Sequence, residues 1–151
     1  MKLDEKGYKL ICDFEGLKLT PYLCSANMAT IGYGNTYYPS GKKVNMTDRP
    51  ITKEYALEIF KDVADRFAGK VDLLVTKELT QNQFNALVSF AYNVGTGNFA
   101  NSTLLKKVNL NPNDLTIKLE FAKWNKANKK VIDGLTNRRK KEAELYFTQN
   151  V

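Results

Sequence analysis

The sequence predicts an α+β fold, in which one helix is followed by a small β region and then by helices to the end of the chain. Three observations predict it: helix-spaced apolar residues near the N-terminus, short β-type runs between residues 17 and 46, and helix-spaced apolar residues after Pro50. We expect a single domain over residues 1–151, since this length sustains one core. Its β lobe would span about 15–50 and its helical lobe about 51–151, with the N-terminal helix packing on the helical lobe and a cleft between the lobes.

The first helix and the β region are predicted from spacing and from turn-forming residues. Apolar residues recur at helical intervals from Leu3 to Phe14, and Gly16 is a typical residue just after a helix end. The runs LKLTPYLC, ATIGYGNTYY and KKVNM then alternate with Pro-, Asn- and Gly-containing turns, as in short strands. Glu15 is therefore expected at a helix end that faces a small sheet.

The remaining chain is predicted to be helical because caps and periodic apolar residues alternate along it. Thr52 is a plausible N-cap for a long helix to about residue 75, with an apolar face of Tyr55, Ile59, Val63 and Phe67. Thr80 and Gln83 match a capping box for a helix that ends at Gly95. Three more helices are expected after Ser102, across 115–124 and across about 137–147, with Trp124 in the core of the helical lobe.

Composition excludes several classes of site. The chain has no histidine, which removes His-based triads and most zinc sites, and we expect neither a metal nor a cofactor. The formal net charge of +7 favours an anionic partner, such as nucleic acid, a membrane surface or a cell wall. The basic run at 138–141 superficially resembles a nucleic-acid patch, but such runs are more often the solvated face of a helix. Phosphate-binding loops, zinc-finger spacing and aromatic RNA-binding motifs do not occur, so nucleic acid is not the expected partner.

Two cysteines are too few for a disulfide scaffold. The opening segment MKLDEKGYKLICDF carries charges among its apolar residues, so neither a signal peptide nor a stable membrane insertion is expected. Cys12 and Cys24 are then expected to be reduced thiols. A disulfide between them is the alternative, since Cys12 lies one helical turn before Glu15 and Cys24 is expected to face the same helix end.

A carboxylate, a thiol and a hydroxyl follow one another at the predicted helix end. Cys24 and Thr30 come 9 and 15 residues after Glu15, in the β region that can fold back over that end. Hydrolysis of a sugar bond needs an acid for the leaving oxygen and usually a second group that places water or attacks the anomeric carbon. This spacing alone is weak support, because an exposed helix-end acid is the commoner role of such a glutamate.

The string FEGLKLTPYLCSANMATIGYGNT, residues 14–36, resembles the catalytic signature of phage lysozymes and endolysins of glycoside hydrolase family 24. That signature is Glu, eight residues, Asp or Cys, five residues, Thr. The resemblance extends along the chain through LTQNQFNALVSFAYNVG at 79–95, NSTLLKKVN at 101–109 and GLTNRRKKEAELY at 134–146. It implies a lysozyme-like fold and cleavage of peptidoglycan glycan strands.

The resemblance also implies roles for individual residues. Glu15 is the general acid, Cys24 holds the second catalytic position, and Thr30 helps to orient the hydrolytic water of an inverting reaction. Further substrate-site residues are an amide that faces the sugar N-acetyl groups, an arginine set against the catalytic glutamate, and a tyrosine that stacks or packs in the cleft: Asn93, Arg138 and Tyr33. Tyr92 could line the cleft in the same way, and Arg139 is the neighbour most easily confused with Arg138.

The sequence departs from the family pattern at two positions. Asn35 stands where a histidine usually follows the Gly-x-Gly, which changes a hydrogen bond near the site. A thiol at position 24 is a weaker base than aspartate at neutral pH. Three roles are therefore possible for Cys24. It positions the water without fully deprotonating it, or it is partly ionised. Alternatively, it is a small buried side chain, and Thr30 with Glu15 carries out the reaction.

The function expected from this resemblance is that of an endolysin. It would hydrolyse the β-1,4 bond between N-acetylmuramic acid and N-acetylglucosamine, as a monomer whose partner is bacterial peptidoglycan. It would stay in the host cytoplasm until it is released to the cell wall in the periplasm. The alternatives are a lytic transglycosylase on the same substrate and a non-catalytic peptidoglycan-binding module.

Overall fold

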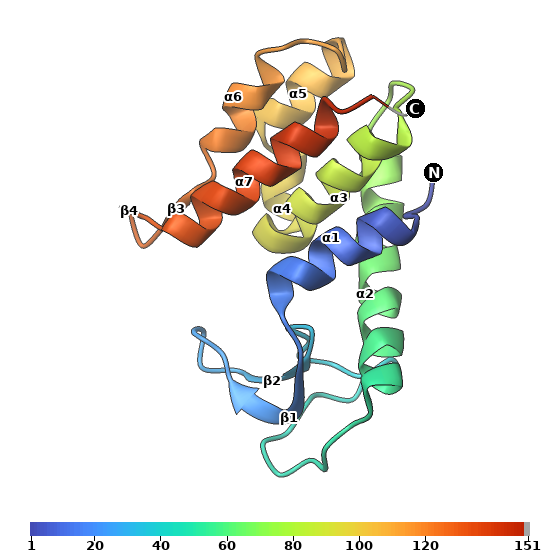
Figure 1. Ribbon diagram of the computed structural model, residues 1–151, viewed down its shortest axis with the longest axis vertical. Coiled ribbons are helices and arrows are strands. Elements are labelled where there is room, and N and C mark those ends of the chain that lie inside the picture. Colours follow the sequence, from blue (N-terminus) through green and yellow to red (C-terminus); the bar gives the residue numbers. More distant parts are fainter. Residues whose placement is uncertain (150–151) are drawn as a thin grey trace. The chain divides into compact units, whose positions relative to one another are not determined.

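The computed structural model describes residues 1–149 and contains mostly helices, with two short antiparallel strand pairs (Figure 1). In chain order the elements are α1 (Glu5–Glu15), β1 (Lys18–Leu23), β2 (Ala29–Gly32), α2 (Lys53–Leu74), α3 (Gln81–Val94), α4 (Thr96–Ala100), α5 (Thr103–Leu110), α6 (Ile117–Ala122), β3 (Lys126–Ala127), β4 (Lys130–Val131) and α7 (Asp133–Tyr146). One helix, a small sheet and a helical remainder follow in the predicted order, so the α+β class is confirmed.

The described residues form two compact units. The N-terminal unit is residues 8–66, and the helical unit is residues 1–7 with 67–149. The boundaries fall within α1 and α2, so both helices contribute to both units. The single domain with a lobe boundary near residue 50 stays a prediction.

The N-terminal unit is built on the pairing of β1 with β2. The strands are antiparallel, with Tyr22 opposite Thr30 and an irregularity in the register between Lys18 and Tyr22. The predicted third strand, KKVNM, is wrong: only an isolated bridge joins Tyr37 to Lys43. Buried Val44 is the one buried residue of that segment, so it lacks the alternating buried face that a longer strand needs.

Helix α2 begins where the sequence predicts, but its apolar face is displaced. The hydroxyl of Thr52 accepts a hydrogen bond from the Tyr55 amide at 3.0 Å, which confirms the N-cap. Within residues 8–66 the fully buried α2 side chains are Ala56, Ile59, Phe60 and Ala64. The predicted face was wrong at Tyr55, whose ring is 37% exposed and stacks on Tyr38.

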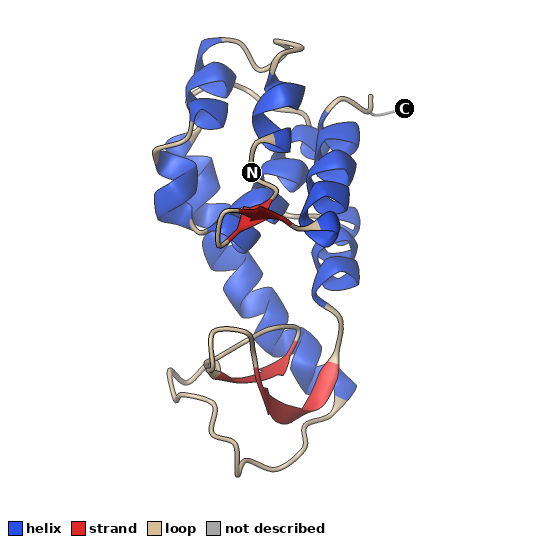
Figure 2. Ribbon diagram, turned by 90° about the vertical axis from the view of Figure 1, so that its left-hand side faces the viewer, coloured by secondary structure: helices blue, strands red, loops and turns tan. Residues whose placement is uncertain are grey.

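Helix α3 lies among the other helices of the helical unit, and it packs against α4 and α7 (Figures 1 and 2). Its capping box is confirmed, since the Thr80 hydroxyl accepts from the Gln83 amide and the Gln83 side chain accepts from the Thr80 amide. The helix ends at Val94, with Gly95 as C-cap, as predicted. The buried Phe90 ring meets the rings of Phe99, Phe121 and Trp124 edge-on at 5.6 to 6.1 Å, which places Trp124 at the core.

Three features of the helical unit differ from the predictions. Helix α6 is shorter than predicted, and α7 begins at Asp133 rather than near residue 137. The structure adds α4 and the β3–β4 hairpin, which the periodicity did not indicate. The hairpin turns through Asn128 and Lys129, both at positive φ, and a lysine there lacks the usual glycine signal.

Candidate active site

Glu15 is the last residue of α1, and the chain leaves the helix directly after it. The Gly16 amide donates to the Cys12 carbonyl at 3.0 Å, and a φ of +68° at Gly16 turns the backbone toward β1. Glu15 is half-buried. The predicted placement of this carboxyl at a helix end before a small sheet is therefore confirmed.

The backbone at Gly34 lies against the Glu15 carboxyl. Gly34 has a φ of +81°, and a Cβ added there would lie 3.1 Å from Glu15 Oε2. A side chain at this position would therefore crowd the carboxyl as well as strain the backbone. The second glycine of the Gly-Tyr-Gly motif is thus required here by a close approach to Glu15.

Cys24 and Thr30 lie together beside the turn that joins β1 to β2. The Cys24 amide donates to the Met28 carbonyl at 3.0 Å, and the Thr30 hydroxyl donates to the same carbonyl at 2.8 Å. Polar groups around the Cys24 thiol lower its pKa below its usual 9.0: the Thr30 side chain has the largest effect, and the backbone amides of Met28 and Ala26 add to it. Cys24 is half-buried and hydrogen-bonded, which argues against the buried-filler alternative.

Tyr22 lies beside Cys24 and Glu15, a position that the sequence did not indicate. Burial raises the pKa of its phenol, and the negative charges of Cys24 and Glu15 act in the same direction. Its ring therefore lies within electrostatic range of both groups, and the Lys18 ammonium sits over it at 5.2 Å. Tyr22 is paired with Thr30 in the β1–β2 register, so the two side chains lie on one face of the strand pair, and this register is the signal that could have found it.

Tyr33 and Asn35 lie inside the N-terminal unit. The Tyr33 ring is 8% exposed and packs on Phe60 with ring centres 5.5 Å apart. Packing is the role that this burial supports, and a contact of Tyr33 with sugar stays a prediction. Asn35 is also buried, and its backbone exchanges hydrogen bonds with Ile31 at 2.8 and 3.0 Å. The asparagine that replaces the usual histidine is thus held in a fixed turn.

Both cysteines are free thiols in the structure, as the expectation of reduced cysteines requires. Burial, together with the smaller effect of the nearby carboxylates of Asp13 and Glu15, raises the pKa of the Cys12 thiol to about 11. Cys12 is thus a weakly ionised thiol on α1, whereas the pKa of Cys24 moves in the opposite direction.

Arg138 lies in the helical unit, in a buried cluster around Glu142. Its Nε is 3.3 Å from Glu142 Oε2, and its guanidinium donates to the Ser89 carbonyl at 3.1 Å. Arg139 pairs with the other Glu142 oxygen at 2.7 Å, and the Ser89 hydroxyl donates to Oε2 at 2.5 Å. The carboxylate of Glu142, absent from the sequence predictions, therefore orients both arginines.

Asn93 also belongs to the helical unit, where it is exposed on α3. Tyr92, its neighbour, packs on the Phe67 ring at 5.2 Å. The sugar contact of Asn93 and the pairing of Arg138 with Glu15 both stay predictions.

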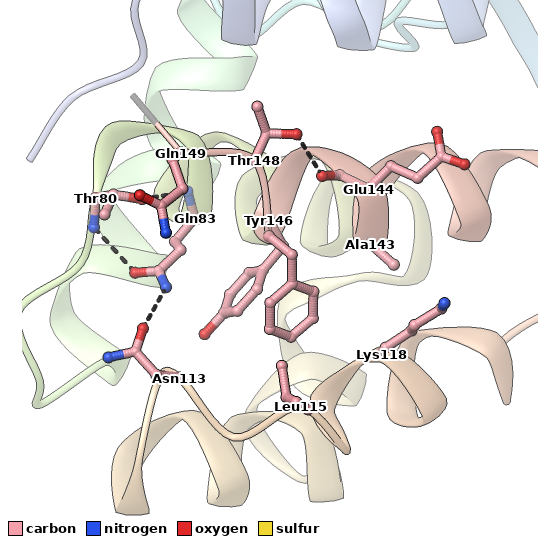
Figure 3. Close-up of a pocket in the computed structure, with 11 residues that line it drawn as sticks. Thr80, Gln83, Asn113, Leu115, Lys118, Ala143, Glu144, Tyr146, Thr148 and Gln149 are labelled. Atoms are coloured by element: carbon pink, nitrogen blue, oxygen red, sulfur yellow. Dashed lines mark hydrogen bonds between the residues drawn. The ribbon is translucent and has the colours of Figure 1, made fainter. Parts of the chain in front are cut away.

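A separate hollow of about 970 Å³ in the helical unit contains none of the predicted site residues (Figure 3). Two of its polar side chains are engaged within the fold: Gln83 donates to Asn113 Oδ1 at 3.2 Å and Tyr146 donates to the Pro112 carbonyl at 2.6 Å.

Residues 1–149 contain neither a candidate metal site nor a helix that could span a membrane. Acidic and cysteine side chains do not gather there in threes as a metal site would need, and the helices found there are too short or too polar to cross a bilayer.

Comparison with known proteins identifies the family. The phage lysozyme family model matches residues 12–142, which include Glu15, Cys24, Thr30 and Arg138. The chain belongs to the phage lysozyme family. A solved endolysin from Escherichia coli O157:H7 phage FAHEc1 superposes with a TM-score of 0.89 at 36% identity, covering 97% of this chain and 94% of that one. A mutant of P22 lysozyme superposes at 0.85 and 32% identity, covering 98% and 99%, which confirms the lysozyme-like fold.

The similarity does not extend over the whole of every relative. The endolysin of Bacillus phage B103 is 40% identical over 150 residues, and the match covers 98% of this chain but 55% of that protein. The chain thus spans about half the length of this relative.

Proposed function

We propose that this chain hydrolyses the β-1,4 bond between N-acetylmuramic acid and N-acetylglucosamine in peptidoglycan, as an endolysin of the muramidase type. The family match over residues 12–142 carries the proposal, since it spans the residues that the chemistry needs. Relatives described as endolysin and lysozyme support the same activity. The substrate follows from these relatives, and the roles of the residues follow from the geometry around Glu15.

Glu15 supplies the proton in this mechanism. In its acid form it gives that proton to the glycosidic oxygen as the bond from this oxygen to the anomeric carbon breaks. The Gly34 backbone beside Oε2 limits the positions that the carboxyl can adopt, which keeps the proton directed at one place.

Cys24 and Thr30 hold the attacking water. Its oxygen bonds to the anomeric carbon from the face opposite the leaving group, and its proton passes to the thiolate of Cys24 or on to solvent. The Thr30 side chain and the neighbouring backbone amides lower the pKa of the thiol, so more of Cys24 is thiolate at neutral pH and can accept this proton.

The two alternative functions make different products. A lytic transglycosylase needs only the acid and closes the muramic acid on itself, and a binding module releases nothing. Digestion of purified peptidoglycan in ¹⁸O-labelled water, followed by mass spectrometry, separates the three. We expect muropeptides with a labelled reducing end; anhydro-sugars would establish the transglycosylase, and an intact glycan would establish the binding module.

We also propose the cellular setting. Peptidoglycan is the partner, the protein acts as a monomer, and it waits in the host cytoplasm until the membrane is opened and it reaches the cell wall. Gel filtration and fractionation of infected cells before and after lysis onset test these points, and a wall-associated protein before onset would contradict them.

A further inference from the structure

The whole net charge of the protein is concentrated in one short segment. Residues 123–141 hold eight of the 23 basic residues and one of the 16 acidic residues. The other 132 residues hold fifteen of each, so their net charge is zero. The formal charge of +7 is therefore a local property of the β3–β4 hairpin and the start of α7, rather than a property of the whole surface.

Part of this charge is neutralised inside the fold, and part is displayed. Arg138 and Arg139 are buried and paired with Glu142, and Lys123 pairs with Glu120 at 2.9 Å. The lysine hairpin, which we define as residues 126–131, is different, since all its residues are exposed. Within residues 1–149 no carboxylate pairs with its three lysines, Lys126, Lys129 and Lys130.

The hairpin presents positive charge in every direction. Lys126 is opposite Val131 and Ala127 is opposite Lys130, so the pleat puts Lys126 and Lys130 on opposite faces. Lys129 stands at the tip, and the hairpin projects from the helical unit beyond the N-terminal end of α7 (Figures 1 and 2). A flat surface can meet only one of these faces, whereas a flexible chain can contact both faces and the tip.

The turn keeps a lysine where glycine is favoured. Asn128 and Lys129 have φ values of +51° and +67°, as a two-residue turn of this type requires. A lysine side chain is disfavoured in this conformation, and glycine would relieve the strain. Because Lys129 occupies this unfavourable backbone conformation at an exposed position, we infer that its side chain has a function beyond forming the turn.

We propose that the lysine hairpin binds the phosphate groups of phosphodiester polymers within the cell wall, and so holds the enzyme on its insoluble substrate. This inference rests on the proposed function, because the polymer must be one that accompanies peptidoglycan. The sequence KANKKV contains no aromatic residue for stacking on bases, which disfavours single-stranded nucleic acid. At the base of the hairpin, Lys118 and Lys140 line a further hollow of about 200 Å³, with Glu144 as its one acidic residue, so the positive surface extends past the hairpin.

The test measures binding separately from catalysis. A catalytically disabled Glu15→Gln background is incubated with purified Gram-positive walls, with the same walls after hydrofluoric acid has removed their phosphodiester polymers, and with phosphatidylglycerol vesicles. A lysine near an anionic surface contributes roughly fivefold, so Lys126→Gln, Lys129→Gln and Lys130→Gln together are expected to weaken binding to intact walls on the order of 100-fold. A matched triple variant at the exposed residues Lys70, Lys77 and Lys106 loses the same charge and is expected to bind nearly as well as the parent.

Lys129→Gly separates binding from folding. Glycine suits the turn, so we expect an unchanged or higher Tm together with roughly fivefold weaker binding to walls. Equal losses in the two triple variants, equal binding to extracted walls, or a preference for vesicles would each overturn the proposal. Digestion of extracted walls by the hairpin variants in an otherwise intact enzyme tests the proposed function separately: we expect the parent rate, and absence of digestion by the parent itself would refute the function and leave the binding result standing.

Discussion

The opposite pKa shifts of the two thiols predict selective chemical modification. Cys24 has a pKa below 9.0, and Cys12 has a pKa of about 11. At about pH 8 the thiolate fraction is then at least ~10% for Cys24 and about 0.1% for Cys12, and only the thiolate reacts. The population of reactive thiolate therefore favours Cys24 by at least ~100-fold.

Intrinsic reactivity offsets part of this difference. A thiolate loses nucleophilicity as its pKa falls, by a factor of about 6 to 10 over two pKa units. The net preference for Cys24 is therefore at least ~10-fold at about pH 8. Burial of Cys12 beside Asp13 and Glu15 can only add to it, because a charged transition state is disfavoured there.

Iodoacetamide labelling followed by peptide mass spectrometry gives both rates in one sample, and glycan hydrolysis is measured alongside. We expect activity to fall in step with the labelling of Cys24. Cys12→Ser should be inactivated at the parent rate, while Cys24→Asp should remain active and resist the reagent. Faster labelling of Cys12, or full activity after complete labelling of Cys24, would refute the reasoning.

Three further predictions test the geometry. Gly34→Ala places a Cβ 3.1 Å from Glu15 Oε2 at a residue with positive φ. We expect kcat to fall at least ~10-fold and the free energy of unfolding to fall by about 1–2 kcal/mol. Unchanged kinetics would contradict the close approach. Glu142→Gln removes the buried partner of two arginines and should cost about 3–5 kcal/mol, or a Tm drop of about 10 °C, whereas the exposed Glu144→Gln should change Tm little. The amide of Asn45 and the hydroxyl of Tyr38 lower the pKa of Asp48 below 3.8, so this carboxylate adds stability above about pH 4 that is lost as the pH falls further. In a plot of Tm against pH, Asp48→Asn should therefore show a smaller decrease at acid pH than the parent. Parallel curves for the two proteins would argue against this role of Asp48.

Local signals in the sequence predicted most element boundaries. The Thr52 cap and the capping box of Thr80 and Gln83 each depend on residues within four positions of one another, and both are found in the structure. The buried face of α2 was misplaced because aromatic Tyr55 fits a helical stripe as well as alanine does, and only packing decides between them. It packs against Tyr38, a residue 17 positions earlier, which periodicity does not show.

The candidate site was predicted where the family motif is local in sequence and missed where it depends on tertiary contacts. Glu15, Cys24 and Thr30 lie within 16 residues, and their helix end and strand pair are local features. The Glu142 cluster joins α3 to α7, because Ser89 and Glu142 are hydrogen-bonded although they lie 53 residues apart. The sequence around Arg138 therefore did not indicate that Ser89 belongs to the same cluster. The hairpin was missed because its turn uses lysine in place of glycine.

The most direct test of the account is the activity of Glu15→Gln on purified peptidoglycan. The amide keeps the size of the side chain but cannot donate a proton to the leaving oxygen, so we expect turnover to fall by about 100- to 10,000-fold with an unchanged Tm. Glu58→Gln, an exposed change on α2, serves as the control and should hydrolyse at the parent rate. A folded Glu15→Gln protein that releases reducing ends at the parent rate would contradict the assignment of Glu15 as the general acid.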